Sequence, residues 1–232
     1  MNEDSAHRLI TQARYAEADL PPLRETTAGR LAWALSVVLH PLLLPTLLFA
    51  LLFWLSPSMM GVAGSGVRYR ILLLLAVSTF VIPMLSTYML YRLGSIRSLA
   101  MEDRQDRVFP FVSTALFYLL TTYMFAKHLS ALYLITLVLG GVTASLLAVT
   151  VVSFFWKISA HSVGISGVAG FLMGFYYHYA AVEYLYPTLA VIVLGGFLMS
   201  ARLYLNAHTP SQVLAGALLG LAVGMGTVFL FA

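Results

Sequence analysis

About seven apolar stretches, each near the length of a membrane-spanning helix, follow one another along this chain. A helix that crosses the hydrocarbon core of a bilayer needs roughly 20 predominantly apolar residues. The stretches cover residues 31–55, 70–92, 108–127, 131–156, 162–182, 186–206 and 210–231. They predict an all-α fold, a polytopic bundle of about seven transmembrane helices, with six as the alternative number.

The composition excludes a soluble domain. Hydrophobic residues make up 60% of the chain and charged residues only 9%, whereas about a quarter of the residues of a soluble domain are charged. We therefore expect an integral membrane protein, in the inner (cytoplasmic) membrane of a bacterium. The net charge of +4 is spread thinly, so we expect no nucleic-acid partner. The absence of cysteine excludes disulfides, thiolate nucleophiles and thiolate metal sites.

The first thirty residues differ from the rest in being polar and of mixed charge. The first apolar stretch begins too far from Met1 for a signal peptide. We expect two parts: a polar arm over 1–30 that is interfacial or mobile, and a single transmembrane helical domain over 31–232.

Small residues recur at helical spacing in two of the stretches. Gly216, Gly220 and Gly224 stand four positions apart, as do Gly170 and Gly174. Such spacing lets two helices approach closely. We favour packing inside one bundle, and a homo-oligomer through these glycine faces is the alternative.

Three polar clusters interrupt the apolar sequence, at residues 103–110, 157–161 and 201–212. They follow the second, fourth and sixth stretches, so two spans separate each cluster from the next. All three must then lie on the same side of the membrane. Arginine is costly inside a bilayer and tends to be functional where it occurs. The clusters therefore predict one anion-binding site at a membrane face.

The third cluster gives the most specific indication of an anion-binding site. Thr209 is a good N-cap, Pro210 suits the first helical position, and Gln212 completes a capping box. His208 then lies at a helix N-terminus, where free N–H groups favour anions. Arg202 can offer two donors to phosphate oxygens. The alternative interpretation is an interfacial arginine and histidine at a helix turn.

The other two clusters supply further polar groups. Lys157 offers a point charge, Ser159 a hydroxyl and His161 a titratable proton, although a snorkelling lysine in a polar turn would look similar. Arg104 and Arg107 precede Pro110, and the positive-inside bias alone would explain them.

Five further polar residues are not assigned to the predicted site. Asp103 and Asp106 are candidate partners for the arginines of the first cluster. His40, His128 and His178 form no ligand set in the sequence, so we interpret them as structural and expect no metal.

The order of these motifs resembles the type 2 phosphatidic acid phosphatase and vanadium haloperoxidase superfamily, over roughly residues 95–225. The family pattern is Lys-x6-Arg-Pro, then Pro-Ser-Gly-His, then Ser-Arg-x5-His-x3-Asp. The second motif reads Ile158-Ser159-Ala160-His161 here, and the third reads Ala201-Arg202-x5-His208-x3-Gln212. For the first motif, Arg97-x6-Arg104 keeps the spacing, whereas Arg107 has a proline three residues on.

The resemblance implies a phosphatidic acid phosphatase-like core and a metal-independent phosphoric ester hydrolase without a cofactor. His208 would be the nucleophile and His161 the general acid. Arg202, Ser159 and one of Arg104 or Arg107 would hold the phosphate, with Lys157 beside them. The substrate would be a phosphate monoester or diphosphate of a lipid in the bilayer, hydrolysed or transferred through a phosphohistidine.

Gln212 departs from the family, which has an aspartate at this position. Its amide oxygen can accept the Nδ1–H of His208, but it cannot neutralise the charge that develops on the ring. One alternative is thus a weak or inactive member that binds lipid phosphate or scaffolds a partner. A second alternative is a transporter-like helix bundle.

Two arguments about the membrane face conflict. The charges flanking the stretches place the N-terminus and the site on the cytoplasmic face. Six-span members of the family that the chain resembles usually work on the outer face.

Overall fold

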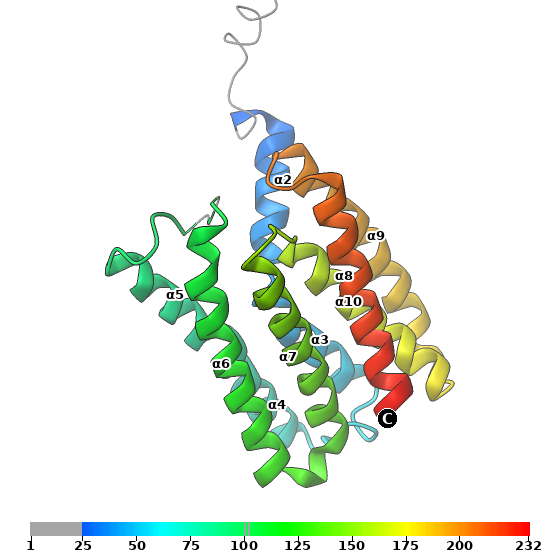
Figure 1. Cartoon of the computed structure of the whole chain (residues 1–232). Helices are drawn as coiled ribbons and strands as arrows, with labels where there is room; N and C mark the ends of the chain where they lie inside the picture. The colour runs from blue at the N-terminus through cyan, green and yellow to red at the C-terminus, as the bar shows by residue number, and fades with distance from the viewer. Residues whose placement is uncertain (1–24, 100, 102) are drawn as a thin grey trace, which may run out of the picture.

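The computed structural model describes residues 25–99, 101 and 103–232, and this part of the chain is all-helical (Figure 1). Residues 1–24 of the predicted polar arm lie outside the described residues. The arm was expected to reach residue 30, but α2 begins at Thr27. The α-helices are α2 Thr27–Val38, α3 Leu44–Leu55, α4 Ser65–Ala76, α5 Ile82–Arg92, α6 Gln105–His128, α7 Tyr133–Ser153, α8 Ala160–His178, α9 Leu185–Tyr204 and α10 Pro210–Phe231.

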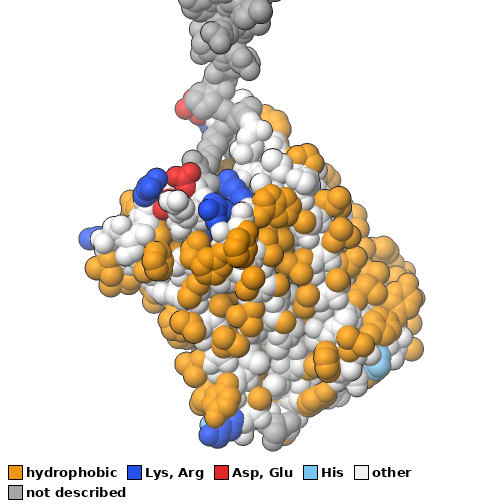
Figure 2. All heavy atoms as spheres, in the orientation of Figure 1, with side chains coloured by type: hydrophobic (Ala, Val, Ile, Leu, Met, Phe, Trp, Pro, Cys, Tyr) orange, Lys and Arg blue, Asp and Glu red, His pale blue; other side chains and the backbone are white. Residues whose placement is uncertain are grey.

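Five helical segments of the described chain are long and apolar enough to cross a membrane. A π-helical segment, η2 (Val77–Val81), joins α4 and α5 into one of them, and a short 3-10 helix, η4 (Val182–Tyr184), extends α9. The segments are Ser65–Arg92, Gln105–His128, Tyr133–Ser153, Val182–Tyr204 and Pro210–Phe231. Figure 2 shows hydrophobic side chains over the middle of the molecule, acidic and basic side chains toward its upper end, and further basic atoms at its lower end. The chain is therefore an integral membrane protein.

The first predicted span, 31–55, is divided into α2 and α3. The amides of Leu43 and Leu44 both donate to the carbonyl oxygen of His40, at 2.8 and 3.2 Å, and this makes a turn between the helices. Pro41 lies in the turn and has no amide proton to continue the helix. The single span expected over 31–55 is therefore broken here into two helices.

The fifth predicted span, 162–182, is also absent from the five segments. It corresponds to α8, which carries serine, glycine and histidine among its apolar residues. Most of α8 is buried among other helices, with Phe171, Leu172 and Phe175 almost fully enclosed. A helix that is surrounded by protein needs no continuous lipid-facing surface. A criterion based on hydropathy can therefore fail to recognise it as a membrane-spanning helix.

The glycine faces lie against each other where α8 crosses α10. A Cβ atom on Gly220 would lie 2.1 Å from the carbonyl oxygen of Val163, and one on Gly224 would lie 2.5 Å from that of Gly167. Gly174 packs in the same way on Val228. The favoured prediction of packing inside one bundle is confirmed, and these faces are occupied within the chain.

The close crossing brings two of the polar clusters together. The amide of Ser159, just before α8, donates to the carbonyl oxygen of Gln212 in the first turn of α10, at 3.3 Å. The starts of α8, α10 and α6 and the ends of α7 and α9 all lie toward the upper end of the bundle in Figure 1. The three clusters thus share one end of the molecule, as counting the spans predicted.

Candidate active site

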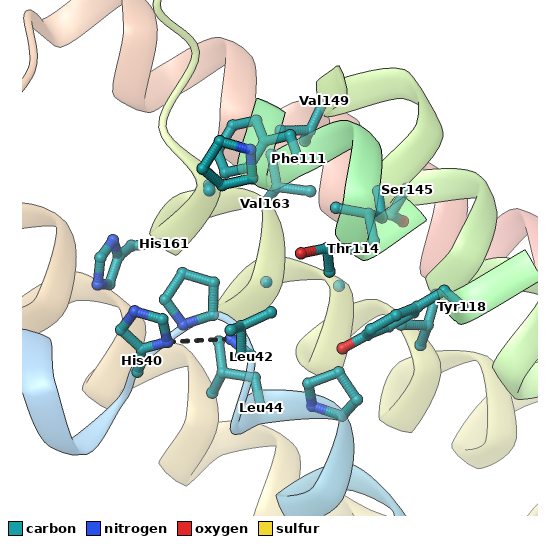
Figure 3. A pocket seen from close by; sticks show the side chains of 18 of the residues that line it. His40, Leu42, Leu44, Phe111, Thr114, Tyr118, Ser145, Val149, His161 and Val163 are labelled. Atoms are coloured by element: carbon teal, nitrogen blue, oxygen red, sulfur yellow. Dashed lines mark hydrogen bonds between the residues drawn. The ribbon is translucent and has the colours of Figure 1, made fainter. Parts of the chain in front are cut away.

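A cavity of about 190 Å³ opens at the end of the bundle where the clusters meet. Its polar end is formed by two arginines and three histidines, and among the described residues that line it none is acidic. These residues are His40, Arg107, His161, Arg202 and His208. The remaining wall is mostly apolar and comes from α3, α6, α7 and α8, including Leu48, Phe111, Val149, Val163 and Phe171 (Figure 3). The cavity therefore combines a cationic end with a hydrophobic chamber.

Hydrogen bonds fix the proton on the ring of His208. Its Nδ1 atom lies 3.1 Å from Oε1 of Gln212 and 3.3 Å from the carbonyl oxygen of Lys157. The orientation of the Gln212 amide is itself determined, because the amide of Thr209 donates to the same Oε1 at 3.2 Å. Both partners of Nδ1 are acceptors, so Nδ1 carries the hydrogen. The neutral ring then has its free lone pair on Nε2.

The local sequence explains why Gln212 is held in this position. Thr209 is the N-cap of α10, Pro210 occupies the first turn, and Thr209 and Gln212 form the predicted capping box. His208 directly precedes the cap and is 7% exposed. One glutamine thus caps the helix and orients the imidazole.

Burial lowers the pKa of His208 to about 4. The charge of Arg107 acts in the same direction, while the hydrogen bond that His208 donates to Gln212 opposes it, and Arg202 and Lys157 add smaller lowering effects. The ring is therefore neutral near pH 7, which is the state that a nitrogen nucleophile requires.

Arg107 is the arginine of the first cluster that reaches the cavity. It is 7% exposed, and its Nε donates to the carbonyl oxygen of Met101 at 2.8 Å. Arg202, in the last turn of α9, lines the cavity beside it. A phosphate between these two guanidinium groups would meet donors from two helices.

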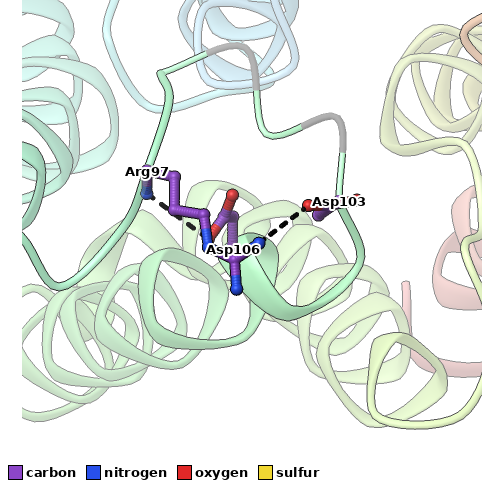
Figure 4. Close-up of polar contacts among 3 residues, drawn as sticks. All are labelled: Arg97, Asp103 and Asp106. Atoms are coloured by element: carbon purple, nitrogen blue, oxygen red, sulfur yellow. Dashed lines mark hydrogen bonds and ion pairs between the residues drawn. The ribbon is translucent and has the colours of Figure 1, made fainter.

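The other arginines of this region lie elsewhere. Arg104 is exposed and bonds to the carbonyl oxygens of Ser153 and Phe154, where α7 ends. Arg97 forms an exposed ion pair with Asp103 at 3.3 Å, and its amide donates to Oδ1 of Asp106 at 3.4 Å (Figure 4). The two aspartates therefore contact Arg97 rather than Arg104 or Arg107.

His161 lies one residue inside α8 and lines the cavity. Its Nε2 atom is 3.0 Å from the carbonyl oxygen of Ser36 in α2. A carbonyl oxygen only accepts, so Nε2 carries a hydrogen and Nδ1 is the acceptor of the neutral ring. The helix α2 thus orients the histidine of the second motif.

Like Arg104, two further residues that the sequence assigned to phosphate binding, Ser159 and Lys157, lie outside the cavity lining. Ser159 is fully buried as the N-cap of α8, and its oxygen accepts bonds from the amide and hydroxyl of Ser162. Lys157 lines a separate outer hollow with Asn206 and Gln212. His208 borders both the hollow and the cavity, and so connects them.

His40 was interpreted from the sequence as structural, but it lines the cavity. Its ring centroid lies 5.9 Å from that of His161, at an interplanar angle of 77°. The available sequence signal was Pro41 in the turn and Pro45 at the start of α3, but these prolines do not indicate which way His40 faces. Among the described residues, no group of three or more His, Asp or Glu side chains is arranged to hold a metal ion.

Comparison with known proteins agrees with this geometry. The family model of the PAP2 superfamily matches residues 149–231, which cover the end of α7 and all of α8, α9 and α10. This match supports the resemblance of the motifs to the type 2 phosphatidic acid phosphatase superfamily over that part of the chain. The matched region and the apolar helices fit a member of a lipid phosphatase family. Searches of curated proteins and of solved structures found no match to the chain.

Proposed function

We propose that this protein is an integral membrane phosphatase or phosphotransferase that acts on a phosphate monoester or diphosphate of a lipid. The observation that carries the proposal is the pairing of His208 with Gln212, at a cavity that also holds Arg107 and Arg202. It leaves the Nε2 lone pair of a neutral imidazole beside two phosphate-binding groups.

In the first step, the Nε2 lone pair of His208 attacks phosphorus, and the bond from phosphorus to the leaving oxygen breaks in line with it. Arg107 and Arg202 stabilise the equatorial oxygens. Burial and the charge of Arg202 lower the pKa of His161 well below its usual value, so Nδ1 carries no proton in the free site. Nδ1 takes the acidic proton of the phosphate monoanion and passes it to the leaving oxygen, while the Nε2–H stays on the carbonyl oxygen of Ser36. The products are phosphohistidine and the lipid alcohol of a monoester, or the lipid monophosphate of a diphosphate.

In the second step, water attacks the phosphohistidine and its proton passes to neutral His161. Phosphate leaves, and Nε2 of His208 regains its lone pair. The outer hollow lined by Lys157 and Asn206 borders His208 and offers a route for this water.

The apolar wall of the cavity supports a lipid substrate. A chain held between α3, α6, α7 and α8 would bury hydrocarbon at roughly 25 cal/mol per Å², while its phosphate stays at the cationic end. Phosphatidic acid, phosphatidylglycerophosphate and prenyl phosphates all have the required form.

The test is phosphate release by the purified protein from each of these lipids in detergent micelles. We expect turnover of at least one lipid, and its loss in His208→Ala. Narrowing the chamber with Ser145→Phe should impair long-chain substrates more than short-chain ones. The control is Ala144→Phe, because Ala144 is the exposed neighbour on the same helix. No turnover of any lipid, or turnover that survives His208→Ala, would contradict the proposal.

Gln212 supports a second candidate, a weak or inactive member that binds lipid phosphate or scaffolds a partner. An amide cannot stabilise the imidazolium charge as a carboxylate does. In that case the wild-type protein would be inert, and Gln212→Asp would confer activity.

A further inference from the structure

His40 occupies an unusual position for a residue of the first apolar stretch. It lies in the turn between α2 and α3, lines the cavity with His161 and Arg202, and its side chain is exposed there. Figure 3 shows the rings of His40 and His161 next to each other on one side of the cavity. The broken helix therefore delivers a third imidazole to the cationic end.

The hydrogen bonding of the turn fixes the tautomer of this ring as well. The amide of Leu42 donates to Nδ1 of His40 at 3.3 Å, as the dashed line in Figure 3 marks. A ring nitrogen that accepts a hydrogen bond carries no hydrogen, so the hydrogen of neutral His40 is on Nε2. The bond that holds the ring uses Nδ1 and leaves Nε2–H for a ligand.

The three imidazoles of the cavity are thus not equivalent. In its neutral form, His208 offers a lone pair on Nε2, and His161 offers one on Nδ1. His40 offers an N–H donor. Although part of the residue is exposed, desolvation by the surrounding protein and then the charge of Arg202 lower the pKa of His40, which favours this neutral donor form near pH 7.

We infer that His40 donates its Nε2–H to a phosphoryl oxygen of the bound substrate, beside the groups of Arg107 and Arg202. The inference rests on the proposed function of the same site. A neutral donor adds a hydrogen bond to the phosphate without adding a further cation beside the nucleophile. His40 is then a substrate-binding residue contributed by the turn between α2 and α3, outside residues 149–231 that match the family.

If His40 only stabilised the turn between α2 and α3, its side chain would need a different hydrogen-bonding group than it needs to bind phosphate. To hold the turn, His40 needs only an acceptor at the position of Nδ1. Asparagine offers an acceptor near that position and has no donor near Nε2, whereas glutamine reaches the Nε2 position with its amide N–H. The two substitutions therefore separate phosphate binding from turn formation.

The experiment measures the dissociation constant of inorganic phosphate for the detergent-solubilised full chain, from the phosphate dependence of its thermal unfolding. It also measures KM and kcat with a lipid phosphate that the wild type hydrolyses. The variants are His40→Asn and His40→Gln. Matched controls are His128→Asn and His128→Gln, because His128 is exposed at the far end of α6.

We expect His40→Asn to weaken phosphate binding about 10- to 100-fold, which is the usual effect of losing a hydrogen bond to a charged group. KM should rise accordingly, and His40→Gln should retain most of the affinity. The His128 variants should match the wild type.

Phosphate affinity that is unchanged in His40→Asn, or lost more severely in His40→Gln, would overturn the inference and leave the proposed function standing. A wild type that binds phosphate through His40 but hydrolyses no lipid would overturn the catalytic proposal alone. A wild type that binds no phosphate would overturn both.

Discussion

Nδ1 of His208 donates its hydrogen to Oε1 of Gln212 across 3.1 Å. The same oxygen accepts a hydrogen bond from the backbone amide of Thr209 at the start of α10. A flip of the Gln212 side-chain amide would therefore break both hydrogen bonds. The helix cap and the proposed nucleophile, His208, are therefore one structural unit. This unit explains how a glutamine can stand where the family has a carboxylate and still select the tautomer with a free Nε2.

The first prediction concerns the acceptor itself. Gln212→Leu removes the partner of Nδ1 and should lower kcat by a factor on the order of 10² to 10⁴, because the ring loses its tautomer and its orientation. Gln212→Glu keeps the length and the acceptor and adds a charge, so it should raise kcat above that of the wild type. The measurement is steady-state turnover of a lipid phosphate.

Gln212→Leu should also lower the free energy of unfolding by about 1 kcal/mol, because the substitution removes part of the helix cap. Assays well below the unfolding temperature of both variants separate this effect from the chemical one. Equal turnover in Gln212→Leu and wild type would show that the hydrogen bond has no catalytic role.

The second prediction concerns pH. Since the pKa of His208 is lowered to about 4, the nucleophile should remain neutral from pH 7 down to about that value. Histidine in the unfolded chain binds its proton near pH 6.5. The unfolded state therefore takes up more protons between pH 6.5 and 4, and the contribution of His208 to stability should fall as pH falls through that window.

The titration can be followed by ¹⁵N NMR of the histidine rings in micelles, with His208→Ala to assign the signal. Arg107→Gln should move the midpoint upward, because Arg107 is the largest charge effect on the ring. A midpoint at 6.5 or higher in the wild type would be incompatible with the buried site.

The third prediction distinguishes the arginines of the first cluster. Arg107→Ala removes a donor group from the cavity and should lower kcat/KM by a factor of roughly 10² to 10³. Arg104→Ala removes an exposed contact to the end of α7 and should have less than a tenth of that effect. If Arg104→Ala were the more damaging change, the first motif would have been assigned to the wrong residue.

The fourth prediction tests the crossing that holds the site together. In Gly220→Ala, the added methyl group would meet the carbonyl oxygen of Val163, and the helices would have to separate. We expect a loss of about 1 to 3 kcal/mol of stability, with reduced activity because His161 and His208 move apart. The control is Gly226→Ala on the same helix, where nothing lies within 4 Å, and it should be neutral or mildly stabilising. Equal unfolding temperatures for the two variants would refute the close packing.

The features that the sequence predicted well depend on local or periodic signals. The capping box at Thr209 and Gln212 is a short-range pattern, and the spacing of Gly216, Gly220 and Gly224 is a helical one. The shared end of the three clusters follows from counting spans. Each of these features can be recognised without knowing which helices are neighbours in the fold.

The features that it missed depend on long-range packing. The contact of His161 with Ser36 joins α8 to α2, and the cavity wall joins four helices that are distant in the chain. Prolines at 41 and 45 are compatible with either a kink or a break. Ser159 is a hydroxyl before a helix, and only the fold decides that it caps α8 rather than facing the cavity.

Covalent catalysis by His208 can be tested by trapping the protein during turnover of a ³²P-labelled lipid phosphate. We expect an acid-labile, base-stable phosphohistidine at His208, with the phosphoryl group on Nε2 as identified by ³¹P NMR of the digested peptide. A label on another residue, a label on Nδ1 of His208, or turnover without any trapped phosphohistidine in rapid-quench experiments would contradict it.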